Sequence, residues 1–211
     1  MVKNKIKKRL LLILCGFGVI TFGIVLILLV ICSNYQYKIE EINKINNFFE
    51  IEKPRDQEIL EEQVIETKNN EISDNEYKYV AVLEIPKINL QKGLSKIGDV
   101  NNNVNVNVEI LENSIMPNNE NSTMILAGHS GIGRTANFKN LYKLNVGDVV
   151  NFYFNKTKYI YKVTDIYTVE KRDSMFLNVR SNKTKLIMIT CHTDSNKQIV
   201  LISELIEKQN Y

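Results

Sequence analysis

The stretch KLIMITCHTDSNKQIVLI, residues 185–202, decides the fold. An apolar run ends in Thr190-Cys191-His192, a few polar residues follow, and a second apolar run begins at Ile199. Two β-type runs with a short polar connection between them are typical of neighbouring strands. Cys191 therefore ends a strand, where it is either a small hydrophobic residue of a core or a nucleophile at the rim of a sheet.

Similar short runs of β-forming residues recur throughout residues 77–211. They predict strands at 79–85, 124–127, 149–154, 159–163, 166–169, 185–190 and 199–205, a hairpin loop at 155–158 and one short helix at 138–144. Many short strands with a single short helix predict an all-β barrel or sandwich. Residues 104–108 alternate between Val and Asn, so they also have the pattern of a strand.

The first 32 residues have the pattern of a membrane anchor. Residues 1–9 carry five basic side chains and no acidic one, and residues 10–32 contain no charged residue. A helix of that length rises roughly 34 Å, which is enough to cross a hydrocarbon core of about 30 Å. The positive-inside rule places the N-terminus in the cytoplasm and the rest of the chain outside. A cleaved signal peptide is the alternative, but the segment ends in VICSN without the small-residue exit of such peptides.

Four regions are therefore predicted: a cytoplasmic basic tail at 1–9, a transmembrane signal anchor at 10–32, a charged stalk at 33–76 and an exported β domain at 77–211. Residues 34–76 carry a net charge of −7, and helical spacing at 39–45 and 58–65 predicts one or two weak helices there. Residues 77–211 carry a net charge of +5 without a basic cluster interleaved with aromatic residues. This pattern does not predict binding of nucleic acid.

Cys191 is the only cysteine of the exported part, because Cys15 and Cys32 lie in the anchor. A disulfide framework or a multi-cysteine metal site is therefore excluded there. A thiol attacks as the thiolate and needs an adjacent base or cation near neutral pH. His192 is adjacent in sequence, but consecutive strand residues point to opposite faces. The better candidate is His129, 62 positions upstream in a glycine-flanked loop after a predicted strand.

Four segments together resemble the sortases, which are membrane-anchored cysteine transpeptidases of Gram-positive bacteria. They are VAVLEIPKINL at 80–90, LAGHSG at 126–131, FKNLYKLNVGDVV at 138–150 and LIMITCH at 186–192. The family signature is Thr-Leu-x-Thr-Cys at the end of a strand, and two of its five positions differ here. The resemblance covers roughly residues 79–205, and the order of the segments and the N-terminal anchor also agree with the family.

The resemblance implies a closed β-barrel of about eight strands with short helices, preceded by a transmembrane helix and a stalk. It implies that Cys191 forms a thioacyl intermediate with a threonine of a sorting signal and that His129 is the general acid for the leaving amine. The implied substrates are surface proteins with an LPxTG-like or related sorting signal, and the implied acceptor is an amine of a peptidoglycan precursor or a pilin. The implied location is the cell membrane, crossed once, with the N-terminus in the cytoplasm and the catalytic domain at 77–211 extracellular. In this family, residues 101–110 match a short helical turn rather than a strand.

One departure from the family concerns the arginine that binds substrate and stabilises the oxyanion at the start of the strand after the cysteine. No arginine follows Cys191 in this chain. Lys197 and Gln198 directly precede the last apolar run, and only one of them can face the site because they alternate in direction. Lys197 keeps the charge without the planar fork of arginine, whereas Gln198 offers a neutral amide donor. Arg134, in the loop after His129, is the third candidate.

Two alternative functions share features with this chain. A cell-wall transpeptidase acting on D-amino-acid substrates has a cysteine after Ser-x-Gly, which Ile189-Thr190-Cys191 does not match. The second alternative is a degenerate sortase barrel that acts as a membrane-tethered binding module. The missing arginine supports this alternative, whereas the presence of both His129 and Cys191 argues against it. No cofactor is expected, no carboxylate cluster stands out as a metal site, and dependence on Ca²⁺ is left open.

Overall fold

The structure is a computed structural model that describes residues 2–52, 79–170, 182–191 and 196–211, without the side chains of residues 2–12. The chain divides into two compact units, Met1–Ile42 and Asn43–Tyr211. The predicted helix at 58–65 lies outside the described residues.

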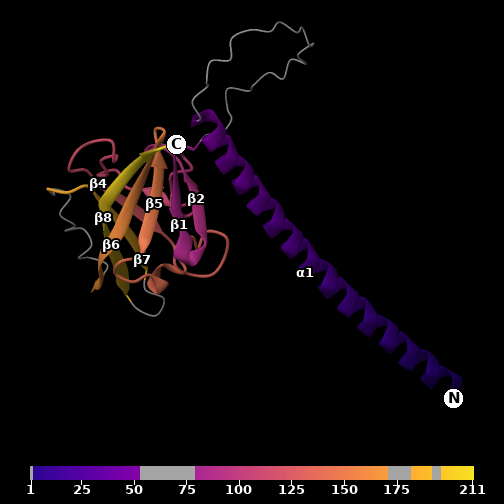
Figure 1. Ribbon diagram of the computed structural model, residues 1–211. Helices are drawn as coiled ribbons and strands as arrows, with labels where there is room; N and C mark the ends of the chain where they lie inside the picture. Colours follow the sequence, from indigo (N-terminus) through magenta and orange to yellow (C-terminus); the bar gives the residue numbers. More distant parts are fainter. Residues whose placement is uncertain (1, 53–78, 171–181, 192–195) are drawn as a thin grey trace, which may run out of the picture. The chain divides into compact units, whose positions relative to one another are not determined.

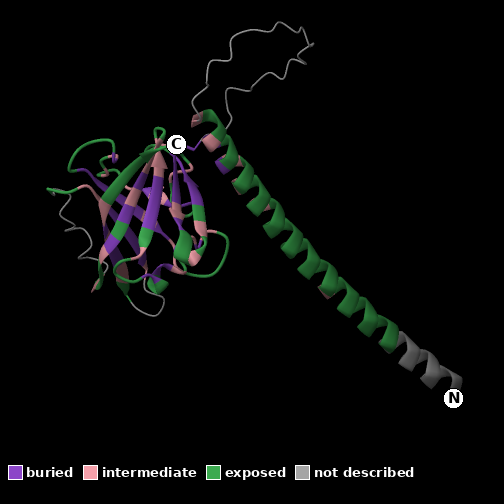
Figure 2. Ribbon diagram, in the orientation of Figure 1, coloured by how far each residue is buried: buried purple, intermediate pink, exposed green. Residues whose placement is uncertain are grey.

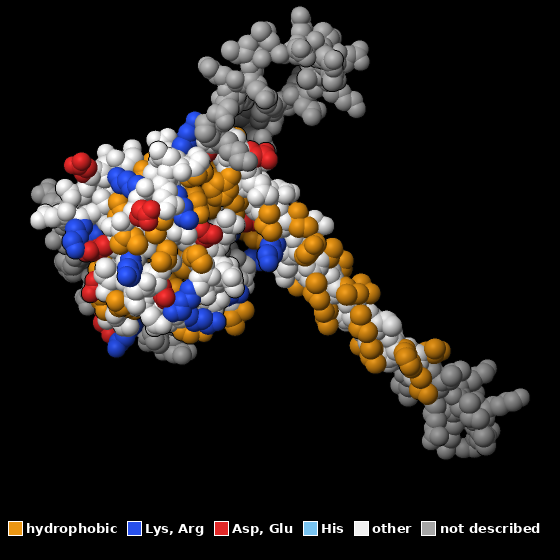
Figure 3. All heavy atoms as spheres, in the orientation of Figure 1, with side chains coloured by type: hydrophobic (Ala, Val, Ile, Leu, Met, Phe, Trp, Pro, Cys, Tyr) orange, Lys and Arg blue, Asp and Glu red, His pale blue; other side chains and the backbone are white. Residues whose placement is uncertain are grey.

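The first unit is formed by most of α1, the helix Val2–Glu52. Its apolar side chains between Ile13 and Ile31 are largely exposed, as the band of hydrophobic atoms in Figure 3 shows. Among the described residues, one helix is long and apolar enough to cross a membrane, and α1 is that helix. Uncompensated exposure of so much apolar surface is unfavourable in water, so this segment suits a lipid environment.

The second unit contains an eight-stranded sheet (Figure 1). Its strands are β1 Ala81–Ile85, β2 Leu90–Leu94, β3 Glu109–Ile110, β4 Thr123–Gly128, β5 Val149–Phe154, β6 Thr157–Glu170, β7 Lys185–Cys191 and β8 Lys197–Asn210. Two 3₁₀ helices, η1 Pro86–Ile88 and η2 Leu141–Lys143, lie between strands. The spatial order is β2-β1-β5-β6-β8-β7-β4-β3, and among these pairs only β4 and β7 are parallel.

The sheet curls into a nearly closed barrel around an apolar core (Figure 2). The edge strands β2 and β3 approach each other, since the Asn107 side-chain amide donates a hydrogen bond of 2.7 Å to the Gly93 carbonyl. The largest fully buried side chains include Tyr161, Phe138 and Phe152. The prediction of a mostly β barrel of about eight strands with short helices, preceded by a long apolar helix, is confirmed.

Local structure departs from the strand pattern in two places. Residues 104–106 form turns rather than a strand, and only Glu109–Ile110 pairs with β4. The two predicted strands at 159–163 and 166–169 are one strand, β6, whose pairing with β8 shifts register between Ile160 and Tyr161 and again between Val163 and Asp165. Bulges of this kind bend a long strand and let it follow the barrel wall. The predicted helix at 138–144 is shorter, with a 3₁₀ helix confined to Leu141–Lys143.

The last residues of α1 belong to the same unit as the barrel. Ile45 and Phe48 are buried in a small cluster with Tyr79 and Val82 of the barrel wall. Residues 43–52 lie in the region predicted as a stalk, and the structure gives them a packing role in the barrel unit.

A cluster of aromatic rings lies next to that contact. The ring of Phe49 lies 5.1 Å from the ring of Tyr153 and 5.6 Å from that of Tyr211, both edge to face. The Glu52 carboxylate accepts hydrogen bonds from the Tyr211 hydroxyl and from the Lys156 backbone N–H. Burial, followed by the hydrogen bond and charge of Glu52, raises the pKa of Tyr211 above its ordinary value. The phenol is therefore held in its neutral, donating form.

Candidate active site

The candidate site is built on three adjacent strands, β8, β7 and β4. Cys191 is the last residue of β7 and lies opposite Gln198 of β8 in the antiparallel register. On the other side of β7, Thr190 is in register with Gly128, the last residue of parallel β4. His129 is the residue after Gly128, and Cys191 is the residue after Thr190. The register of β4 with β7 therefore places His129 at the strand end next to Cys191.

The alternation of side chains along β7 decides which face carries the cysteine. Leu186 and Met188 belong to the barrel core, whereas Ile187 and Ile189 belong to a separate apolar cluster on the other face of the sheet. Cys191 has the same parity as Ile187 and Ile189 and therefore lies on that outer face. Its side chain is partly exposed, as a nucleophile that meets an external substrate must be.

The alternation of side chains also distinguishes Lys197 from Gln198, the two candidates for the oxyanion position before the last apolar run. Directly opposed residues of an antiparallel pair carry their side chains on the same face, so Gln198 shares the outer face with Cys191. Lys197 points to the other face, and its ammonium lies 3.8 Å from the carboxylate of Glu170 in an exposed ion pair. Gln198, rather than Lys197, is therefore the side chain placed beside the sulfur.

The backbone around His129 is held by close packing. The Thr190 hydroxyl donates a 2.8 Å hydrogen bond to the Gly128 carbonyl, and this bond is buried. A Cβ atom on Gly128 would lie 2.8 Å from the ring of Phe138, so only glycine fits there. The Phe138 N–H donates a 2.9 Å hydrogen bond to the His129 carbonyl. These contacts fix both ends of the loop 129–138 and, with them, the position of His129.

The imidazole of His129 contacts the Asn105 side chain, with 3.3 Å between Nε2 and Oδ1. Because an amide oxygen only accepts, this contact favours the neutral tautomer that carries its proton on Nε2. Nδ1 is then the ring nitrogen that can take up and release a proton. Asn105 lies in the turns at 104–106, which bring it to His129 from 24 residues upstream.

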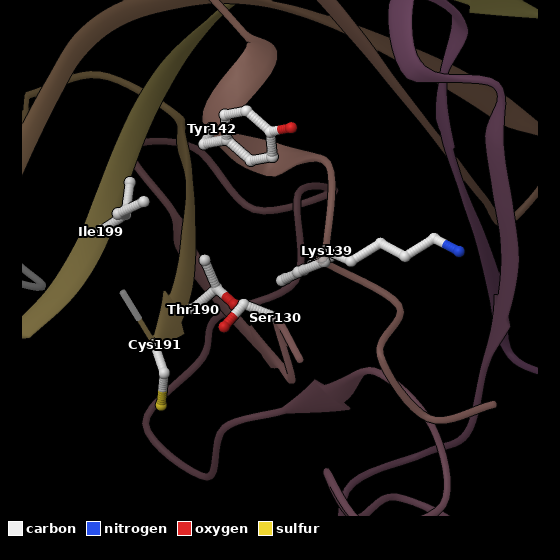
Figure 4. Close-up of a pocket in the computed structure, with 7 residues that line it drawn as sticks. Ser130, Lys139, Tyr142, Thr190, Cys191 and Ile199 are labelled. Carbon is white, nitrogen blue, oxygen red and sulfur yellow. The ribbon is translucent and has the colours of Figure 1, made fainter. Parts of the chain in front are cut away.

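A pocket of about 220 Å³ opens beside Cys191 at the end of the barrel. Its lining residues are Ser130, Phe138, Lys139, Tyr142, Thr190, Cys191 and Ile199. Figure 4 shows Ser130 and Thr190 close to Cys191, with Tyr142 and Lys139 on the far side of the pocket. Cys191 thus lines the pocket and also lies on the face of β7 that carries the outer apolar cluster.

The Sortase domain family model matches residues 83–206, which include His129, Cys191 and Gln198. The chain belongs to the sortase family. It is similar to Sortase D of Bacillus subtilis (strain 168), with 27% identity over 111 residues, and this match covers 53% of each chain. The sortase thus spans about half the length of the curated relative it matches.

Solved structures show the same fold. One is a Sortase D5 transpeptidase from Clostridium perfringens, with 23% identity and a TM-score of 0.54, covering 62% of this chain and 80% of that one. Another is sortase C1 from Streptococcus agalactiae, with 24% identity and a TM-score of 0.56. This match covers 66% of this chain and 73% of that one. The resemblance stated from the sequence is confirmed at the level of family and fold.

The structure of this sortase brings together His129, Cys191 and Gln198 among the residues proposed from the sequence. Arg134 is exposed in the loop after His129 and, like His129 and Gln198, is not among the residues that line the pocket beside Cys191. His192, Arg172 and Arg180 lie outside the described residues. Within the described part of the chain, no group of three or more His, Cys, Asp or Glu side chains could hold a metal ion.

Sequence reasoning missed Asn105 and the pocket residues Ser130, Lys139 and Tyr142. Asn105 carried no signal, since asparagine is abundant throughout 101–121. Lys139 and Tyr142 lie three residues apart in the predicted short helix, and that spacing places two side chains on one face. This spacing, next to the histidine loop, was a usable signal for a shared surface near the site.

Proposed function

We propose that this sortase is a cysteine transpeptidase that cleaves the sorting signal of a surface protein and transfers the protein to an amine. The observation that supports this most is the placement of Cys191 on the outer face of the sheet, between His129 on one neighbouring strand end and Gln198 on the other. Acyl transfer by a thiol requires these three functions: a nucleophile, a proton carrier and a donor to the oxyanion.

In the first step, the Cys191 thiolate attacks the carbonyl carbon of the scissile peptide bond. A C–S bond forms, the carbonyl oxygen becomes an oxyanion, and the Gln198 amide donates a hydrogen bond to it. The C–N bond then breaks, and protonated His129 gives its proton to the departing amine. The product is a thioester between Cys191 and the carboxyl side of the surface protein.

In the second step, a neutral primary amine attacks the thioester carbonyl. A C–N bond forms, the C–S bond breaks, and the amine proton passes to His129. The Cys191 thiolate is regenerated and His129 is again protonated, so the cycle closes without a cofactor. Asn105 Oδ1 can accept a hydrogen bond from Nε2–H of His129 in both protonation states, which leaves Nδ1 to carry the transferred proton.

The proposed contact surface for the sorting signal is formed by Leu111, Val169 and Ile202, which are partly buried and pack against the outer apolar cluster. The cluster itself consists of Ile125, Ile187, Ile189 and Val200, which are at most 7% exposed and support that surface from below. Because β7 continues from this region to Cys191, a peptide extended along the strand would present its carbonyl at the sulfur. The Leu and Pro of an LPxTG-like signal, which lie upstream of the threonine at the scissile bond, suit an apolar surface.

The membrane helix supports a location at the cell envelope. With the basic residues 3–9 in the cytoplasm, the barrel faces the exterior, where surface proteins and the amine of a peptidoglycan precursor or a pilin are present. A membrane-tethered module that binds sorting signals without cleaving them is the second candidate, and the absence of an arginine after Cys191 favours it.

Mass spectrometry of the full chain in detergent, incubated with LPxTG-like and NPxTN-like peptides, tests the proposal. We expect a covalent adduct on Cys191 that hydroxylamine releases, since hydroxylamine cleaves thioesters. The Cys191→Ala variant should form no adduct. Peptide binding without cleavage or adduct in the unaltered protein would establish the binding module instead.

A further inference from the structure

The connection from β4 to β5 forms an exposed surface at the end of the barrel that holds Cys191. Within residues 138–144, backbone hydrogen bonds join residues three apart, as from the Leu141 N–H to the Phe138 carbonyl at 3.0 Å and from the Leu144 N–H to the Leu141 carbonyl at 3.1 Å. At about three residues per turn, every third residue lies on the same side of the backbone. Phe138, Leu141 and Leu144 are buried in the core, so the side chains between them point away from it.

The outward side of this connection combines apolar and basic side chains. Tyr142 and Val146 are 63% and 64% exposed. Lys139 and Lys143 are also exposed, and the Lys143 ammonium lies 5.8 Å from the centre of the Tyr142 ring. Figure 4 shows the Lys139 ammonium and the Tyr142 hydroxyl directed away from Cys191. These polar ends therefore face solvent rather than the sulfur.

The loop after His129 adds to this surface. The Phe138 N–H donates a hydrogen bond to the His129 carbonyl, so the loop begins and ends beside the connection. Ile132 in this loop is fully exposed, and Arg134 is exposed as well. Ser130 of the loop and two residues of the connection line the same pocket, so both segments border one opening. The rim surface formed in this way comprises Ile132, Arg134, Lys139, Tyr142, Lys143 and Val146.

The rim surface belongs to a segment of positive charge. Residues 130–147 contain three basic residues and no acidic one. Asp148, the next acidic residue, forms an ion pair of 2.7 Å with Lys87. Single exposed apolar residues are common on soluble proteins, but here three of them lie among three basic side chains. A partner that fits this surface is therefore anionic and also accepts aliphatic and aromatic side chains.

The surface of an anionic bilayer has both properties. Its headgroups carry negative charge, and the region just below them accepts apolar side chains, with tyrosine favoured at that depth. The same chain carries α1, which is long and apolar enough to cross a membrane. A bilayer held by α1 is present at a high effective concentration, so weak contacts are sufficient for docking.

We propose that the rim surface is a second membrane contact, through which the barrel docks on anionic lipid headgroups. Its three basic side chains lie at the lipid phosphates, and its three apolar side chains enter the interface between headgroups and acyl chains. A barrel docked in this way holds the opening beside Cys191 at the lipid surface. The inference does not depend on the proposed function, because contact with lipid requires no catalytic step.

The chain contains no tryptophan, so Tyr142→Trp provides a single fluorophore on the rim surface. The full chain is reconstituted into vesicles of phosphatidylcholine, alone or mixed equally with phosphatidylglycerol, and quenching by lipids brominated near the headgroup measures the docked fraction. Each basic side chain near an anionic surface favours binding by about fivefold, so we expect the ratio of docked to undocked barrel to be about 10- to 100-fold higher in the anionic vesicles. In 1 M salt, where the Debye length is about 3 Å, most of that difference should disappear.

Paired variants of the Tyr142→Trp protein identify the side chains responsible. Lys139→Gln combined with Lys143→Gln should lower the ratio of docked to undocked barrel by about 25-fold in anionic vesicles, or about fivefold for each charge. The matched control is Lys158→Gln combined with Lys208→Gln. It also removes two lysine charges, but at the end of β6 and β8 opposite the rim surface. Its ratio should equal that of the Tyr142→Trp protein.

A second reporter tests which face of the barrel meets the lipid. Ile206 is 56% exposed on β8 towards that opposite end, so Ile206→Trp should show little quenching. Quenching as strong as that of Tyr142→Trp would show that another face is in contact. Equal quenching of Tyr142→Trp in both kinds of vesicle, or a lysine pair without a larger effect than its control, would show that the rim surface does not recognise anionic lipid. Absence of quenching in both kinds of vesicle would refute lipid docking altogether.

Discussion

The Gln198→Ala variant distinguishes a role of Gln198 in catalysis from a contribution of Gln198 to the stability of the fold. If the Gln198 amide donates to the oxyanion, its removal should lower kcat by about 10²- to 10³-fold, or 2.7–4 kcal/mol, as loss of one oxyanion donor does elsewhere. Lys197→Ala is the matched control, because Lys197 points to the opposite face and pairs with Glu170. Its effect on kcat should be less than about threefold.

The expected effect on stability follows from the burial of Gln198. Its Oε1 atom is buried and has no hydrogen-bond partner within the described part of the chain. An unsatisfied buried polar group costs about 1–3 kcal/mol, whereas the methylene lost in the alanine variant contributes about 0.8 kcal/mol. The free energy of unfolding should therefore stay within about 2 kcal/mol of its original value, or rise.

The assay combines peptide cleavage, followed by chromatography, with urea denaturation of the same preparations. A large loss of kcat together with unchanged or increased stability supports the oxyanion role. Equal, small losses from Gln198→Ala and Lys197→Ala would refute it, and Arg134 would be the next residue to replace. Gln198→Arg should maintain or raise kcat, since the arginine fork can span the substrate carbonyl and the developing charge.

Four further outcomes are expected. Cys191→Ala should abolish the peptide adduct while lowering the free energy of unfolding by at most about 2 kcal/mol, as measured by denaturation; a variant that still cleaves peptide contradicts the nucleophile assignment. Asn105→Ala should lower kcat by about 2- to 10-fold with little change in KM, because one hydrogen bond to the imidazole is worth about 0.5–1.5 kcal/mol; an unchanged kcat would show that the contact is incidental. Phe49→Ala should lower the free energy of unfolding of the barrel unit by about 1–3 kcal/mol, since three edge-to-face ring pairs are lost, with Phe48, Tyr153 and Tyr211; a thermal midpoint equal to that of the unaltered chain would argue against this packing. The raised pKa of Tyr211 keeps its phenol protonated in the folded state, so its contribution to stability should be fully present below about pH 10 and be lost as pH rises further. Tyr211→Phe should reduce the alkaline loss in pH-dependent unfolding without abolishing it, because the pKa values of Tyr153 and Tyr161 are raised too.

Much of the barrel could be predicted because its strands alternate buried and exposed residues or form short apolar runs. The strand β2, Leu90–Leu94, was missed because LQKGL has neither pattern. The run at 104–108 misled in the other direction: its alternation is perfect, yet residues 104–106 form turns in which Asn105 reaches His129. The conformation of such a segment depends on contacts with residues distant in sequence, which the local residue pattern does not reveal.

Within the candidate site, the sequence pointed to Cys191 and His129 as candidates because each residue type is scarce and each follows an apolar run. It left Lys197 and Gln198 as alternatives, because a connection of a few residues after Cys191 permits more than one register. The register of β7 with β8 depends on the whole length of the two strands, from Lys185 opposite Glu204 to Cys191 opposite Gln198. The register is thus determined by many residue pairs along the two strands, and the sequence of the short connection after Cys191 does not reveal it.

The parallel pairing of β4 with β7 has a consequence for how the protein acquires activity. His129 and Cys191 are brought together by strands separated by more than fifty residues, and β7 is flanked on its other side by β8. Closing such a long loop costs entropy that only the completed sheet compensates. A partly folded chain therefore has an isolated thiol without its proton carrier, and reactivity towards peptides should emerge in the same kinetic phase as the final consolidation of the barrel.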